Sequence, residues 1–377
     1  MTTRFLLFAV AAFSWIGWSG ADGRTWTDST GQLQVEAEFV SSQPGMVWVL
    51  RTDGEVFGVP LDGLSKGDQE YVLQQLRRKQ AEAEKHTPAP GQPPSIPYGP
   101  ARKLGNLANQ RIEESSGLAP SRRHPGWFWT HNDSGGEPRI YLFDSKGRDL
   151  GSYLLAGIRA YDWEDVASFE SEGKDYLLLC DVGNNGRAAG VQILHLVEEP
   201  ALDPKRGLES RPLPVAQTIY FSYQDDHRDC EAVAVDPTDK TILFVSKERG
   251  MECYAYALGW PKDDPDSKSA VVARLIATLK IPPATAMDVS PDGRRAVVLS
   301  YGNAYEYTRI ANEDWGKAFS RPPREITMPV RVQGESICYG PDGKTLYLTS
   351  EKLPTPLWEI RAEETSTDVP ADGDRAQ

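Results

Sequence analysis

Trp163-Glu164-Asp165-Val166-Ala167 is one copy of a short motif that recurs along the chain, and this recurrence decides the fold. In most copies an acidic or small polar residue precedes a pair of apolar or small residues. The five copies are Ser115-Ser116-Gly117-Leu118-Ala119, Trp163-Glu164-Asp165-Val166-Ala167, Cys230-Glu231-Ala232-Val233-Ala234, Ala286-Met287-Asp288-Val289-Ser290 and Gly334-Glu335-Ser336-Ile337-Cys338. Self-similarity of this kind indicates a repeat architecture.

Short apolar segments follow each copy after a turn. The first of them are residues 127–130, 176–180, 242–245, 296–299 and 346–349. Four such strands per copy are typical of a propeller blade, so we predict an all-β chain with a five-bladed β-propeller over residues 101–362. Segment 104–112 precedes the first copy without a partner, and we expect it to complete the fifth blade. A six-bladed alternative requires a blade in 200–217 or 260–268, which are polar and rich in Pro.

Residues 22–78 have a different pattern. Val35, Ala37 and Phe39 alternate with polar residues, and an Asp53-Gly54 turn follows a second alternating run. Alternation broken by such turns predicts short antiparallel strands with one buried face, here a small barrel. Ser65 is placed to cap a helix that has Asp68 in its first turn.

The motifs Arg24-x-Trp26-Thr27-Asp28, Val35-Glu36-Ala37-Glu38-Phe39 and Leu64-Ser65-x-x-Asp68-x-x-Tyr71-Val72 resemble the Sla-type homology domain. The resemblance implies a Src-homology-3-like barrel. It also implies a peptide or protein partner, because the eukaryotic adaptor of this family binds short peptides that contain Asn-Pro-Phe. Many exported proteins of planctomycete-type bacteria carry a similar domain.

Composition and the chain ends suggest where the protein works. A net charge of −13 disfavours nucleic acid and anionic lipid as partners. Residues 1–21 are typical of a signal peptide, which predicts export to the periplasm or the extracellular space. If that segment were retained, it would instead anchor the protein in a membrane. Residues 79–100 are predicted to be a Pro-rich linker, and 363–377 a disordered tail.

The cysteines are spaced irregularly. Cys180, Cys230, Cys253 and Cys338 form no pair of the CxxC type, which disfavours a zinc ribbon. We interpret them as buried strand residues. In an oxidising compartment Cys230 and Cys253 could form a disulfide, because both fall in one repeat, but their spacing alone does not fix the geometry.

Acidic residues converge where the copies are aligned. The first residues of each recurring strand should line one end of the propeller channel, and the ends of the following strands add more oxygens. The predicted ligand or rim residues are Asn132, Asp133, Asp162, Glu164, Asp165, Glu231, Asp288 and Glu335. For a bound cation, with Ca²⁺ as the candidate cofactor, the predicted ligands are Asp162, Glu164, Asp181 and Glu231. The alternative is that these acids pair with Arg139, Arg187, Arg228 or Lys247.

A second resemblance rests on Glu114-Ser115-Ser116-Gly117-Leu118, Thr130-His131-Asn132-Asp133-Ser134-Gly135 and Asp181-Val182-Gly183-Asn184-Asn185. These stretches are similar to exported bacterial propeller proteins of unassigned activity, and more remotely to esterase-like phytase and SdiA-regulated propellers. The usual family form of the last motif is Asp-x-Gly-Asp-Asn. Asn184 replaces its second Asp here, and the loss of one carboxylate would weaken a cation site.

Catalytic motifs are few. The sequence has no Gly-x-Ser-x-Gly elbow, phosphate loop or His-Glu-x-x-His pair. His131, predicted on a rim loop, is the candidate acid or base. Two hypotheses follow: an exported module that binds a peptide through its barrel and an unknown ligand through its propeller, or a metal-assisted phosphoesterase or related hydrolase. The lack of a complete catalytic motif favours the binding module over an enzyme.

Overall fold

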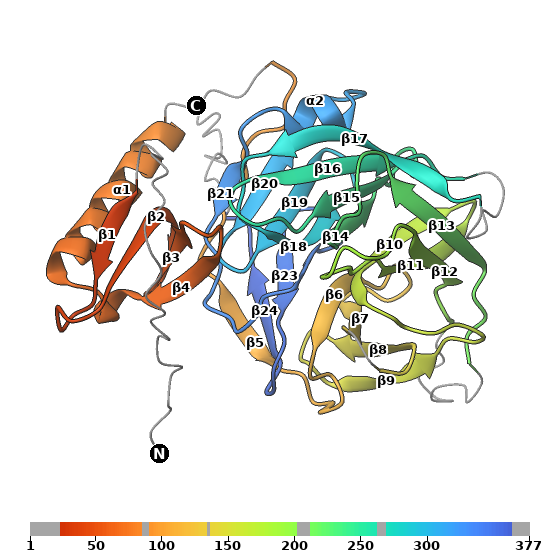
Figure 1. The fold of residues 1–377 in the computed structure, drawn as a ribbon. Helices are drawn as coiled ribbons and strands as arrows, with labels where there is room; N and C mark the ends of the chain where they lie inside the picture. The colour runs from red at the N-terminus through yellow and green to blue at the C-terminus, as the bar shows by residue number, and fades with distance from the viewer. Residues whose placement is uncertain (1–22, 85–89, 134–135, 202–211, 262–268, 364–377) are drawn as a thin grey trace, which may run out of the picture.

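The computed structural model describes residues 23–84, 90–133, 136–201, 212–261 and 269–363. The chain is mostly β, with a small N-terminal sheet on one side and a larger group of sheets on the other (Figure 1). The predicted signal peptide and all but the first residue of the predicted tail lie outside the described residues. Among the helices that are described, none is long and apolar enough to cross a membrane.

The N-terminal sheet is an antiparallel meander in the order β1-β2-β3-β4. Its strands are β1 (Arg24–Thr27), β2 (Gln34–Gln43), β3 (Met46–Arg51) and β4 (Val56–Pro60), followed by the 3₁₀ turn η1 (Leu61–Gly63). Ala37, Val47 and Val49 are buried around Trp26, whose indole N–H donates to the Ala37 carbonyl at 3.0 Å. The predicted alternation therefore marks the buried face of this sheet.

Helix α1 (Lys66–Glu84) begins where the sequence predicts. The Ser65 hydroxyl accepts a hydrogen bond from the Asp68 backbone N–H at 3.2 Å, which is the N-cap interaction. Asp68 is buried, pairs with Arg24 and accepts from the Thr27 N–H at 2.9 Å, so it ties the helix to β1. The helix continues past residue 78 into the segment predicted as linker.

The later part of the predicted linker packs against the larger sheets. Ile96 is buried, and the Tyr98 hydroxyl donates to the Glu306 carboxylate at 2.9 Å. The guanidinium of Arg295 donates to the Pro94 carbonyl at 3.1 Å. A Pro-rich chain keeps its carbonyl acceptors although it lacks N–H donors, so arginine side chains can hold it in place.

The larger part of the chain contains five four-stranded units, which agrees with the five copies of the motif. The first two units are β6 (Ser115–Pro120), β7 (Trp127–Asn132), β8 (Arg139–Asp144) and β9 (Asp149–Leu154), then β10 (Trp163–Ser171), β11 (Lys174–Asp181), β12 (Gln192–Glu198) and β13 (Gln217–Tyr223). The next two are β14 (Cys230–Val235), β15 (Ile242–Ser246), β16 (Cys253–Leu258) and β17 (Val271–Leu279), then β18 (Ala284–Val289), β19 (Arg295–Ser300), β20 (Ala304–Thr308) and β21 (Arg324–Ile326). The fifth is β22 (Ser336–Tyr339), β23 (Leu346–Thr349), β24 (Pro356–Ile360) and β5 (Arg102–Asn106). Parallel pairing of β13 with β17 joins the second and third units into one eight-stranded sheet, and α2 (Trp315–Phe319) lies between β20 and β21 in sequence.

The first strands of the units contact one another in a closed series, β6 to β10 to β14 to β18 to β22 and back to β6. Five apolar clusters fill the spaces between neighbouring units. The units therefore form a ring, in which each sheet buries both faces. The predicted orphan strand pairs antiparallel with β24, although it is shorter than expected and spans Arg102–Asn106. Most of the two segments that a sixth unit would need, 200–217 and 260–268, lies outside the described residues.

The four cysteines are buried and free. The possible Cys230–Cys253 disulfide is therefore absent, because β15 lies between β14 and β16, the strands that carry these residues. The thiols of Cys180, Cys230 and Cys253 instead contact backbone carbonyls, and that of Cys253 lies 3.4 Å from the Pro282 oxygen.

The N-terminal sheet touches the ring directly. Gln43 donates to the Gly302 carbonyl at 2.5 Å, and Asn303 donates to the Ser42 carbonyl at 3.2 Å. The Gly250 N–H donates to the Gly54 carbonyl at 2.9 Å, and Lys79 pairs with Glu325 at 2.9 Å. The turn after β19 is thus a docking point for the N-terminal sheet.

Candidate functional site

A group of buried and half-buried polar side chains occupies one end of the ring, which we call the mouth. Its members lie at the start of the first strands or just after the second strands of the units. They are Asp133, Asp162, Glu164, Glu231, Lys247, Tyr301, Glu335 and Glu351. Acids outnumber the single lysine in this set, so the negative charge of the acids dominates what the mouth can bind.

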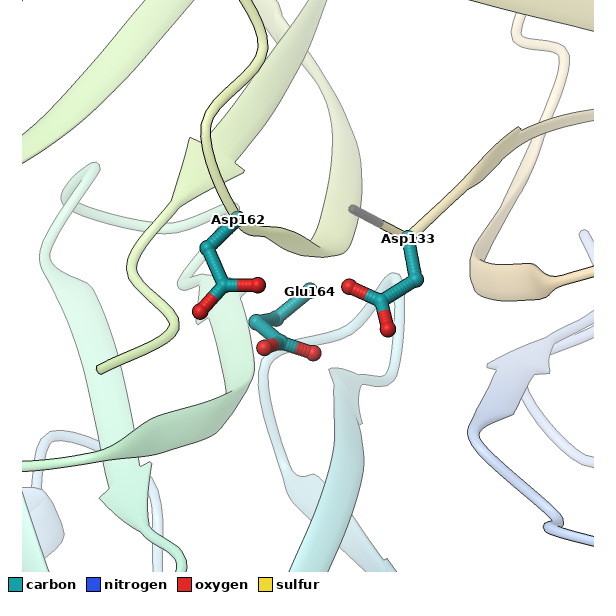
Figure 2. A group of neighbouring side chains, drawn as sticks. All are labelled: Asp133, Asp162 and Glu164. Atoms are coloured by element: carbon teal, nitrogen blue, oxygen red, sulfur yellow. The ribbon is translucent and has the colours of Figure 1, made fainter. Parts of the chain in front are cut away.

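Three of these acids form a compact carboxylate cluster. Asp133 follows β7, whereas Asp162 and Glu164 flank the start of β10, and Figure 2 shows the three carboxylates turned toward one another. One oxygen from each lies within 4.8 Å of the others. Glu164 is 3% exposed, and no described residue donates a hydrogen bond to its carboxylate.

The loops beneath the cluster are held by backbone contacts. The Asp181 carboxylate accepts the Tyr161 N–H at 3.0 Å and the Asp162 N–H at 2.9 Å. Gly183 lies directly below, and a Cβ atom at this position would overlap the carboxylates of Asp162 and Glu164. Glycine is needed here for space, since any side chain would displace the acids.

Lys247 is the cation of the mouth. Its ammonium pairs with the Glu231 carboxylate and donates to the Tyr301 hydroxyl at 2.9 Å. The Tyr301 hydroxyl in turn donates to Glu335 at 3.0 Å. The negative field of Glu231 raises the pKa of Lys247, which therefore stays charged and committed to this pair.

Burial and like charges raise the pKa values of several acids at the mouth. Burial, followed by the charge of Asp162, raises the pKa of Asp133 to about 7. The Glu335 pKa rises to about 10, through burial and a hydrogen bond to the Glu351 carboxylate. Burial and the neighbouring Glu231 raise the pKa of Glu164 as well. The mouth thus requires protons or a cation to offset its charge.

The predicted rim residues Asp165 and Asp288 do not face the mouth. Both carboxylates accept hydrogen bonds from backbone N–H groups of their own unit and of other units. Asp165 accepts from Val166 and Val233 at 2.9 Å and from Met287 at 3.1 Å, and Asp288 accepts from Val289 and Tyr339 at 2.8 Å. They fasten the inner strands to one another, so their role is structural.

His131 and Asn132 also differ from prediction. His131 lies in β7 with no exposed surface, packs against Trp163, and has a pKa lowered to about 4 by burial. A side chain without access to solvent cannot exchange a proton with a substrate at the mouth. Asn132 donates to the Arg111 carbonyl at 2.7 Å and therefore braces a loop.

Of the four predicted cation ligands, two belong to the carboxylate cluster and two have other partners. Asp162 and Glu164 belong to the carboxylate cluster, but Asp181 holds a loop and Glu231 is paired with Lys247. Asp133 is the third member of the carboxylate cluster. Tyr301, which the sequence analysis missed, follows β19 just as Lys247 follows β15 and Asp133 follows β7. Its position at the end of a second strand was the available signal.

The N-terminal sheet carries a separate groove of about 230 Å³. Its lining is almost entirely apolar and is formed by Trp26, Thr27, Asp28, Leu33, Gln34, Val35, Val49, Val59, Pro60, Gly63 and Leu64. None of the residues that hydrogen-bond to the ring lines this groove.

Residues 20–80 match SLA1 homology domain 1. This family is a peptide- or protein-binding adaptor domain, and the match covers β1 to β4 and most of α1. The ring is not assigned to a family. None of the curated proteins compared with the chain matches it. The similarity therefore bears on the groove of the SLA1 homology domain and leaves the mouth to be interpreted from its chemistry.

Proposed function

We propose that this protein is an exported binding protein whose SLA1 homology domain holds a peptide or protein segment in its apolar groove. The observation that carries this proposal is the groove itself. This apolar surface remains open because the domain contacts the ring through other residues. Apolar recesses edged by a few polar groups are typical of ligand-binding sites. Asp28, Thr27 and Gln34 supply such groups. Export rests on the sequence of residues 1–21.

We further propose that the N-terminal sheet is a Src-homology-3-like barrel and that the ring is a five-bladed β-propeller presenting its mouth to a second ligand. The closed series of first strands, the five clusters between units and the completion of the fifth unit by β5 support the propeller. In this arrangement the domains would be the barrel at 22–78, a connecting segment at 79–100 and the propeller at 101–362.

The hydrolase alternative has weaker support. Lys247 and Arg187 are not free to hold a phosphate ester, because Lys247 is paired with Glu231 and Arg187 is paired with Glu248, so a hydrolase would depend entirely on a bound metal ion. His131, the candidate acid or base, is buried. We therefore favour ligand binding over catalysis.

A charge placed in the groove tests peptide binding. Leu33 lines the groove and is 38% exposed, so Leu33→Glu should leave the fold intact and weaken binding of an Asn-Pro-Phe peptide at least tenfold, because a carboxylate would have to be desolvated. The matched control is Leu76→Glu on α1, where leucine is also 38% exposed but lies outside the groove. Binding to the full chain is measured by fluorescence polarisation. Equal affinities of the two variants would contradict the proposal, as would failure of the unaltered protein to bind.

A further inference from the structure

The geometry of the carboxylate cluster permits coordination of a calcium-sized ion. Ca²⁺ takes oxygen ligands at about 2.4 Å, so two oxygens on one ion can be at most about 4.8 Å apart. Oxygens from Asp133, Asp162 and Glu164 satisfy this limit. The three side chains converge from two units of the ring, as Figure 2 shows, and leave a common point between their carboxylates.

The cluster lacks the partners that buried carboxylates normally have. Glu164 is 97% shielded from solvent, since only 3% of it is exposed, yet no described residue donates to its carboxylate. One oxygen of Asp133 is also buried without a hydrogen-bond partner. A buried carboxylate without donors or a counter-ion is costly. These unpartnered oxygens point to a missing cation.

No described basic side chain fills that place. Lys247, the nearest ammonium, is held by Glu231 and Tyr301, and the Arg187 guanidinium is held by Glu248. The cluster also does not collapse on neighbouring donors, because Asp181 fixes the backbone of Tyr161 and Asp162 from below. Gly183 leaves the space that the carboxylates occupy. The surrounding residues therefore hold the three carboxylates in this arrangement.

We propose that Asp133, Asp162 and Glu164 bind a divalent cation of the calcium class at the mouth of the ring. The side chains supply three anionic oxygens, and water or a ligand completes the six to eight oxygens that Ca²⁺ takes. The bound ion neutralises the acids and offers open positions to an anionic or hydroxyl-bearing ligand. This site is independent of peptide binding by the SLA1 homology domain.

The test compares melting temperatures of the full chain in excess Ca²⁺ and in chelator. An ion that binds only the folded protein should raise the melting temperature by roughly 5 °C at a hundredfold excess over Kd. The double variant Asp133→Asn with Glu164→Gln should lose this rise. In chelator it should melt at or above the temperature of the unaltered protein, because repulsion is relieved, and this result would show that it folds.

The control is Glu306→Gln, which alters an equally buried acid that lies between the Tyr98 and Tyr339 hydroxyls. This variant should keep the full response to Ca²⁺. Calorimetric titration with Ca²⁺ should detect one site in the unaltered protein and none in the double variant. An unaltered protein that melts equally in Ca²⁺ and chelator would overturn the proposal, and so would a double variant that keeps the response.

Discussion

Two regions of the ring contain buried carboxylates, and the two regions differ in the hydrogen-bond donors that surround these groups. Between the inner strands, Asp165 and Asp288 are surrounded by backbone N–H donors from neighbouring units. At the mouth, no described residue donates a hydrogen bond to the buried Glu164 carboxylate or to the buried oxygen of Asp133. The sequence places Glu164 and Asp165 side by side, yet they face different surroundings. Carboxylates with hydrogen-bond donors hold the ring together, whereas those without donors form the proposed cation site.

The largest expected effect comes from breaking the satisfied region. Asp165→Ala leaves the N–H groups of Val166, Val233 and Met287 buried and unpaired, and should lower the free energy of unfolding by about 3–5 kcal/mol. Urea unfolding measures this loss. Glu164→Gln is the comparison, because in chelator it should cost little or even stabilise. Equal losses in the two variants would show that the regions do not differ.

The pH dependence of stability sharpens the same comparison. Glu335 faces Glu351, Glu231, Lys247 and Tyr301, and its pKa is raised to about 10. The folded state therefore keeps a proton that the unfolded chain loses above about pH 4.5, so this contribution is full below that pH and declines as pH rises toward 10.

In chelator, unfolding free energy should fall by about 4 kcal/mol between pH 5 and 8. Urea unfolding across this range measures the slope. Glu335→Gln should flatten it, because the amide does not titrate. A variant with the slope of the unaltered protein would assign the pH dependence to other groups.

The smallest expected effect on stability concerns Gly183, which lies beneath the carboxylate cluster. Gly183→Ala places a methyl group against the flexible ends of Asp162 and Glu164, which can move aside, so the loss should be about 1 kcal/mol. The displaced carboxylates should nevertheless respond less to Ca²⁺ in a melting experiment. Gly186→Ala is the matched control in the same loop, where an added Cβ meets nothing within 4 Å. A full Ca²⁺ response in Gly183→Ala would refute the proposal that Gly183 leaves the space these carboxylates need.

Local patterns predicted the repeated strands well because alternation and turn residues act over short distances. The five copies of the motif, the N-cap at Ser65 and the pairing of the orphan strand with the last unit all followed from such patterns. The Pro-rich segment was harder, because contacts such as that of Tyr98 with Glu306 join residues far apart in sequence.

The site was only partly predictable for a related reason. Alignment of the copies identified the convergence of acids but not which way each side chain points, since a bulge at the start of β10 shifts the register between Trp163 and Asp165. That shift lets Asp165 reach the amides of two other units, while Glu164 faces the mouth. Sequence spacing alone gives no sign of this irregularity.

The pairing of β5 with β24 has a consequence for how the protein is made. On the ribosome, Arg102–Asn106 emerges long before Pro356–Ile360, its partner in the sheet. Until β24 has been translated, the hydrogen-bonding edge of β5 has no native neighbour and the ring cannot close. A nascent chain stalled before β24 would carry an open edge, exposed to other strands or to chaperones. Closure of the ring therefore waits for the synthesis of β24.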